Sequence, residues 1–145
     1  MNAGRKIQRL PGMRDVAGSD YERLGRLSYT LASFLREGGY VAVDTPLMEE
    51  TDLFVRKSGG ELTSRLYTFT DPGGHRVSLR PEFTSSVIRY YIQEEESLSP
   101  PIRWQYVGPV FRYEPGSGLP RQFTQLGAEL IGAGGVEIDA DIAYL

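Results

Sequence analysis

Two long segments with the composition of β-strands constrain the fold more than any other part of the chain. They are IRWQYVGPVFRYE and RQFTQLGAELIG, and the connector PGSGLP joins them. β-Branched and aromatic residues favour strands, and a connector rich in glycine and proline favours a turn. We therefore predict a long antiparallel hairpin.

Side chains along the second of these segments alternate between two faces. The small, apolar face suits packing against a helix layer, and it comprises Thr124, Leu126, Ala128 and Leu130. The opposite face carries an aromatic ring, an amide and a carboxylate, and it comprises Phe123, Gln125, Gly127 and Glu129. On the preceding segment Arg112 and Glu114 share a face, and hairpin pairing would set that face beside Gln125 and Glu129.

Together Arg112, Glu114, Phe123, Gln125 and Glu129 would form one polar surface, which we call the floor. A floor of this kind suits a zwitterion that carries a phosphate, such as an aminoacyl adenylate. Carboxylates and amides accept hydrogen bonds from an ammonium group, and arginine binds a carboxylate or a phosphate through two parallel hydrogen bonds. The alternative is that the polar residues face water on a half-solvated antiparallel sheet, and periodicity alone favours this second interpretation. We expect Glu129→Ala to abolish ligand binding and to leave the fold intact, because a surface-facing carboxylate on a strand contributes little stability.

The first half of the chain predicts a helix followed by shorter strands. A helix is expected over residues 20–37, with Ser19 and Glu22 as a capping box and Gly38-Gly39 as its stop. The run YVAV predicts a short strand that ends at Thr45-Pro46. LYTFT and HRVSL flank the turn residues DPGG and predict a β-hairpin.

A second helix is expected over residues 85–93, followed by a solvated loop over residues 94–101. The segment LRPEFT precedes this helix. Glu82 and Thr84 within it can offer oxygen atoms to a ligand, or they can serve as a helix cap and a first-turn acid. The acidic segment 136–145 resembles the opening of a further helix.

Composition excludes several classes of chemistry. The chain has 145 residues, 40% of them hydrophobic and 24% charged, which is typical of one globular domain. It has no cysteine, which excludes disulfides and thiolate metal sites. Its single histidine leaves no combination for a zinc site or a Ser-His-Asp triad, so we expect no metal site built from its own side chains. His75 is interpreted as a hairpin residue. No segment predicts a membrane span or a signal peptide, so we expect a cytoplasmic protein.

The order of several motifs resembles the histidyl-tRNA synthetase family of class II. The matching segments, which cover nearly the whole chain, are GMRD, GYVAVDTPLMEE, LYTFTDPGG, LRPEFT, VFRYE and RQFTQLGAELIG. Residues 22–50 look like motif 1 and residues 104–132 look like motif 2. The resemblance implies an α+β fold, with an antiparallel β-sheet flanked by helices, over a single partial domain of residues 1–145. It also implies a homodimer formed through motif 1.

The resemblance further implies a role for each residue of the floor. Glu82, Thr84 and Gln125 would hold the histidine α-amino group, and Glu129 would reach toward the imidazole. Arg112 would be the catalytic group that binds the α-phosphate and the substrate carboxylate. The adenine would be held by Glu114 and Phe123, and Arg121 would lie near the ATP phosphates. In the implied reaction the histidine carboxylate attacks ATP, with Mg²⁺, to give histidyl adenylate and pyrophosphate, and the histidyl group is then transferred to tRNA; this chemistry depends on positioning and on neutralising charge.

The chain departs from the family pattern at three points. Phe83 follows LRPE where the family usually has glycine, and PGSGLP is shorter than the usual motif 2 loop, so that only Arg121 remains near the phosphates. The chain ends before motif 3, before a later histidine-binding loop and before an anticodon-binding domain. We therefore expect a fragment that is inactive alone. Two alternatives remain: a histidine-sensing regulatory subunit that partners the catalytic subunit of ATP phosphoribosyltransferase, and a dimerising module that binds no ligand.

Overall fold

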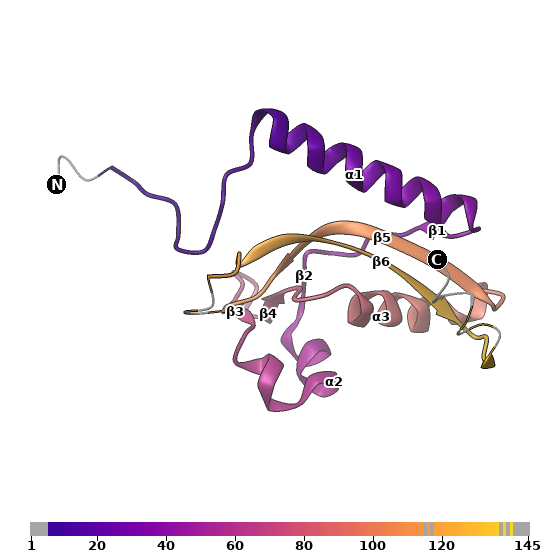
Figure 1. Ribbon diagram of the computed structural model, residues 1–145. Coiled ribbons are helices and arrows are strands. Elements are labelled where there is room, and N and C mark those ends of the chain that lie inside the picture. Colours follow the sequence, from indigo (N-terminus) through magenta and orange to yellow (C-terminus); the bar gives the residue numbers. More distant parts are fainter. Residues whose placement is uncertain (1–5, 115, 117, 137, 139, 141–145) are drawn as a thin grey trace.

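The computed structural model describes residues 6–114, 116, 118–136, 138 and 140, with the side chains of residues 57–62 left aside. These residues form two three-stranded sheets with three α-helices around them (Figure 1). One sheet has the order β1-β5-β6, and the other has the order β2-β4-β3. The expected α+β class with antiparallel sheets is confirmed, although β1 pairs with β5 in parallel.

The predicted long hairpin is the central element. β5 (Ile102–Phe111) pairs antiparallel with β6 (Gln122–Ile131) over ten residue pairs. In Figure 1 helix α1 (Gly18–Glu37) runs along one side of this ribbon, and α3 (Thr84–Glu94) lies on the other. The apolar face of β6 therefore packs on a helix layer as predicted, and a second helix lies on the polar face.

Helix α1 begins at Gly18, so Ser19 lies inside it and the predicted capping box is wrong: Ala17 occupies the cap position and makes no side-chain cap. The predicted stop is confirmed. Gly39 has a φ of 84° and its N–H donates to Arg36 O at 2.9 Å, which closes the last turn. The strand β1 (Val41–Ala42) then pairs with the middle of β5.

The second sheet contains the predicted short hairpin, β3 (Tyr67–Thr70) and β4 (Arg76–Leu79). At its turn the His75 N–H donates to Asp71 Oδ1 at 2.8 Å, and this hydrogen bond is the main reason that the pKa of Asp71 lies below its ordinary value. His75 is thus a hairpin residue, as interpreted from the sequence, and it lies one residue before β4 begins at Arg76.

Two elements were not predicted, namely β2 (Met48–Glu50) and α2 (Thr51–Thr63). A chain of hydroxyl groups ties them to the hairpin: the buried Ser78 Oγ lies 2.9 Å from the buried Thr51 Oγ1 and 2.9 Å from Thr68 Oγ1. A 3-10 turn (Glu95–Ser97) occupies part of the segment expected to be a loop, after α3. The helix expected over residues 136–145 falls mostly outside the described residues.

The core lies between α3 and the β5–β6 hairpin. Its buried members are Phe83, Val87, Trp104, Tyr106 and Val110. The register pairs Trp104 with Glu129 and Tyr106 with Gly127, so these core residues share a face of the hairpin with the predicted polar floor. None of the described helices is long and apolar enough to cross a membrane.

Candidate functional site

Two polar side chains of β6 contact the segment that precedes α3. The Phe83 N–H donates to Gln125 Oε1 at 3.2 Å, and Thr84 Oγ1 donates to Glu129 Oε1 at 2.7 Å. These contacts join residues more than 40 positions apart in the chain. The predicted floor residues Gln125 and Glu129 therefore meet the predicted ligand segment LRPEFT, and all are half-buried or buried.

Arg112 contacts the same segment from the end of the first long strand. Its Nε donates to Pro81 O at 2.9 Å, and its guanidinium carbon lies 5.1 Å from the centroid of the Phe123 ring. Glu82 accepts hydrogen bonds from the Ser85 N–H at 3.0 Å and from the Ser85 hydroxyl. Glu82 thus accepts a hydrogen bond from an N–H group in the first turn of α3 that has no partner within the helix, and its carboxylate lies beside the floor.

Glu129 is held from a second direction. Tyr106 donates its phenolic hydrogen to Glu129 Oε1 at 3.1 Å, beside Thr84, which binds the same oxygen. Burial, together with the neighbouring Glu129 carboxylate, raises the pKa of Tyr106 to about 12. Glu129 is therefore not a surface-facing carboxylate. The expectation that Glu129→Ala costs little stability is corrected, because the substitution would leave two donors without their acceptor.

Arg80 is a buried arginine that sequence reasoning did not assign. Its side chain is 2% exposed, and it donates to Thr45 O at 2.6 Å and to Pro109 O at 3.0 Å. Its guanidinium carbon lies 3.7 Å from the centroid of the Phe83 ring. Burial lowers the pKa of Arg80 from its ordinary value, and the ion pair with Asp44 offsets part of that shift. Arg80 therefore fixes the segment that carries the candidate ligand groups.

Two predicted nucleotide-binding residues point elsewhere. Glu114 forms an ion pair with Arg65, with 3.2 Å between Oε1 and Nη1. The Arg121 guanidinium lies 4.4 Å from the Tyr113 ring centroid, and the Arg121 N–H donates to Gly12 O. The structure thus brings Glu82, Thr84, Arg112, Phe123, Gln125 and Glu129 to one region and leaves Glu114 and Arg121 beside it.

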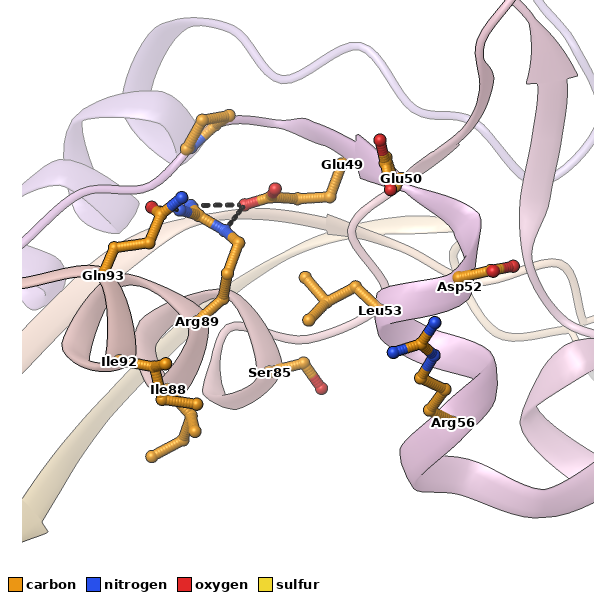
Figure 2. Close-up of a pocket in the computed structure, with 11 residues that line it drawn as sticks. Glu49, Glu50, Asp52, Leu53, Arg56, Ser85, Ile88, Arg89, Ile92 and Gln93 are labelled. Atoms are coloured by element: carbon orange, nitrogen blue, oxygen red, sulfur yellow. Dashed lines mark hydrogen bonds and ion pairs between the residues drawn. The ribbon is translucent and has the colours of Figure 1, made fainter.

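A separate open cavity of about 900 Å³ lies between α2, α3 and β2 (Figure 2). Its wall includes Leu53, Ile88 and Ile92, and an ion pair of 2.8 Å joins Arg89 to Glu49 at its edge. None of the predicted site residues lines it. The candidate site rests on convergent polar side chains rather than on this cavity. Within the described part of the chain, no cluster of three or more acidic or histidine side chains forms a metal site.

Sequence reasoning missed Tyr106 and Arg80, and only Tyr106 had a signal in the sequence. In an antiparallel pair the residue opposite Gly127 shares a face with Glu129, and Tyr106 occupies that position. Arg80 belongs to the LRPE motif and is flanked by an apolar residue and a proline. Its burial follows from contacts with residues 44–45 and 109, which no local pattern indicates.

Similar solved structures define the class of the fold. The chain superposes on apo histidyl-tRNA synthetase of S. aureus with a TM-score of 0.81 and 33% identity, over 96% of this chain and 37% of that one. An ATP phosphoribosyltransferase regulatory subunit/histidyl-tRNA synthetase from Bacillus halodurans gives a TM-score of 0.86 and 26% identity, over 99% and 37%. The described fold is therefore part of a class II synthetase-like domain.

Sequence comparison identifies the family. Residues 12–145 match the histidyl-tRNA synthetase family. The histidine–tRNA ligase of Pyrococcus horikoshii is 41% identical over 140 residues, and that of Methanospirillum hungatei is 40% identical over 140 residues. The chain belongs to the histidyl-tRNA synthetase family. It covers 96% of its own length in both matches but only 32% and 34% of these relatives, so it spans about a third of their length.

Proposed function

We propose that the chain forms the part of a histidyl-tRNA synthetase-like catalytic domain that binds histidine and ATP. In the intact protein this domain would form the aminoacyl adenylate and charge tRNA. The observation that carries the proposal is the convergence of Gln125, Glu129 and Arg112 on residues 81–84. Family membership supports it.

The candidate site has acceptors for an α-ammonium group. Glu82 supplies a carboxylate whose hydrogen bonds, within the described part of the chain, come from the nearby Ser85. Thr84 Oγ1 gives its hydrogen to Glu129 and keeps its lone pairs, and Gln125 Oε1 keeps a second lone pair beside the one used by the Phe83 N–H. An ammonium group has three N–H donors, and these three residues match that number.

Glu129 would recognise the imidazole in this proposal. Both of its donors bind Oε1, and among the described residues no hydrogen bond reaches Oε2. A carboxylate oxygen with free lone pairs accepts an imidazole N–H. Because Oε1 is fixed from two sides, the direction of Oε2 is set before a ligand arrives, which lowers the entropic cost of binding.

Arg112 supplies the positive charge. Its Nε is used on Pro81 O, which fixes the plane of the guanidinium and leaves the terminal nitrogens to bind a carboxylate or an α-phosphate. Phe123 lies beside the guanidinium and offers a ring face for the adenine. For Glu114 to reach the adenine amine and Arg121 the phosphates, each would have to exchange its present contact with Arg65 or Tyr113.

The chemistry assigned to these side chains is positioning and charge neutralisation. The carboxylate of histidine attacks the α-phosphate of ATP and pyrophosphate leaves, so no side chain acts as a nucleophile. We propose that the intact protein uses ATP and Mg²⁺, which the resemblance to the histidyl-tRNA synthetase family implies. The described residues include no cluster of acidic side chains that fits Mg²⁺, so no residue of this chain is assigned to the metal.

Titration calorimetry combined with pyrophosphate exchange tests the proposal. The chain should bind histidine, and Gln125→Ala should weaken that binding while Gln93→Ala, on the exposed side of α3, should not. Exchange activity is measured on the chain and on any longer form of the protein. Absence of histidine binding would refute the proposal and leave a dimerising module that binds no ligand.

A second candidate is a histidine-sensing regulatory subunit of ATP phosphoribosyltransferase, with the catalytic subunit of that enzyme as its partner. The similarity to the Bacillus halodurans structure supports it, as does the short connector PGSGLP, which contains no arginine and leaves only Arg121 nearby. Histidine binding without ATP binding or exchange would favour this candidate over the synthetase.

We also propose a cytoplasmic homodimer formed through motif 1. Helix α1 carries apolar side chains that are exposed to solvent in the single chain: Leu24, Leu27, Leu31 and Phe34 are 39%, 55%, 41% and 49% exposed. A row of apolar residues on a helix favours burial against a partner, and a second copy of the chain offers the same row.

A further inference from the structure

Phe83 lies at the centre of a three-layer stack beside the candidate site. Its ring is parallel to that of Tyr106, with centroids 4.4 Å apart and an angle of 8° between the planes. The guanidinium carbon of Arg80 lies 3.7 Å from the Phe83 ring centroid. Phe83 is fully buried, so a ligand in the candidate site does not touch its ring.

Both ends of the stack are anchored by hydrogen bonds. Arg80 donates hydrogen bonds to the carbonyl oxygen of Thr45, which follows β1, and to that of Pro109, which lies in β5. Tyr106 donates to Glu129 Oε1 at 3.1 Å. The ring of Phe83 is therefore the spacer between a fixed arginine and the phenol that orients Glu129.

Two glycines show how closely the stack fits the hairpin. A Cβ on Gly108 would lie 2.7 Å from Arg80 Nη2 and 3.0 Å from Phe83 Cζ. On Gly127 it would lie 2.5 Å from the Tyr106 hydroxyl. The distances of 2.7 Å and 2.5 Å are too short for a carbon atom, so the stack leaves no room for a side chain at either glycine.

We propose that Phe83 is a positioning residue that determines ligand specificity through Tyr106 and Glu129. Its ring holds the Tyr106 phenol against Oε1 of Glu129, so that Oε2 faces the side chain of the bound amino acid. The site then selects an amino acid whose side-chain ring donates an N–H. This proposal rests on the proposed function for its ligand, but the coupling between Phe83 and Glu129 exists without a ligand.

A flat ring is required for this role. Leucine at position 83 keeps much of the apolar volume but offers no face to Tyr106, and the phenol gains freedom to leave Glu129. Loss of the spacer and loss of the hydroxyl should therefore have the same effect on Glu129. Tyr106→Phe removes the hydroxyl directly and preserves the stacked ring, which makes it the matched variant.

The first test needs no ligand. The side-chain carboxyl ¹³C resonance of Glu129 is measured at neutral pH in glutamate-labelled chain and assigned with Glu129→Gln. Phe83→Leu and Tyr106→Phe should shift it in the same direction, and the double variant should shift it no further than Tyr106→Phe alone. Phe69→Leu, at a 43% exposed aromatic position on β3, is the control and should leave it unchanged. If Phe83→Leu does not fold, Phe83→Met replaces it. An unshifted resonance in a folded variant overturns the proposal.

The second test measures specificity. Calorimetry compares histidine with 2-thienylalanine, which has a similar ring without an N–H group. Phe83→Leu and Tyr106→Phe should each reduce the preference for histidine by about tenfold, because one hydrogen bond to a charged acceptor is misdirected. Equal losses for the two ligands overturn the specificity role. If the unsubstituted chain binds neither ligand, the proposed function fails, and the carboxyl resonance alone decides whether Phe83 positions Glu129.

Discussion

Replacing Arg80 with alanine should be among the most damaging single changes to the described core. The substitution removes the donors that satisfy two backbone carbonyls, Thr45 O at 2.6 Å and Pro109 O at 3.0 Å. Each hydrogen bond from a charged donor is worth roughly 1.5–3 kcal/mol when its partner is left buried and unpaired. The Asp44 partner is 82% exposed, so that ion pair adds little.

These terms give an expected loss of about 3–6 kcal/mol in the free energy of unfolding. Typical domains have a total of about 5–15 kcal/mol, so the variant should be marginally folded. Urea unfolding followed by tryptophan fluorescence measures the loss, because the single tryptophan, Trp104, is 8% exposed and stacks on Tyr90 at 5.2 Å.

Arg23→Ala is the matched control. Arg23 is 79% exposed and pairs only with Asp20 on the surface of α1, so its replacement should change the free energy of unfolding by less than about 0.5 kcal/mol. If Arg80→Ala cost as little as Arg23→Ala, Arg80 would not fix the segment before α3, and the account of how that segment is positioned would be wrong.

Three further changes probe the hairpin and α1. Tyr106→Phe should make unfolding less sensitive to alkaline pH: because the pKa of Tyr106 is raised to about 12, its stabilisation is complete below pH ~10 and is lost as pH rises from there to 12. Urea unfolding at pH 8 and 11 measures this, and parallel pH profiles for the two proteins would contradict it. Gly127→Ala should cost about 1–3 kcal/mol, because its Cβ would lie 2.5 Å from the Tyr106 hydroxyl; unchanged stability in urea would show that the hydroxyl moves freely. Leu27→Glu should convert a dimer to a monomer in sedimentation velocity, because Leu27 is 55% exposed on the apolar row of α1, and an unsubstituted chain that is already monomeric would rule out dimerisation through α1.

Local signals in the sequence predicted most of the fold. Alternation along residues 122–131 and the connector rich in glycine and proline predicted the central hairpin, and Gly38-Gly39 predicted the end of α1. Helix α2 was missed because it contains Gly59-Gly60, which oppose helix formation. The parallel pairing of β1 with β5 was missed because it joins residues distant in sequence, which no local pattern specifies.

In the candidate site, too, some residues were predicted by local patterns and others were not. Alternation correctly placed Gln125 and Glu129 on one face because both lie inside β6. For Arg112 and Glu114 the argument weakened, because β5 ends at Phe111 and alternation no longer fixes side-chain direction beyond that residue. Glu114 accordingly pairs with Arg65. Burial of the floor under residues 81–84 is a tertiary contact that only the structure shows.

Calorimetric titration of histidine into the chain and into Glu129→Gln tests the central claim most directly. Glutamine keeps the shape of the side chain and an acceptor for Thr84 and Tyr106, but it replaces the negative carboxylate that would receive the imidazole N–H. We expect the chain to bind histidine and the variant to bind it at least about tenfold more weakly, with its urea midpoint nearly unchanged. Equal affinity in the two proteins would contradict the claim that Glu129 and the segment before α3 form a histidine site.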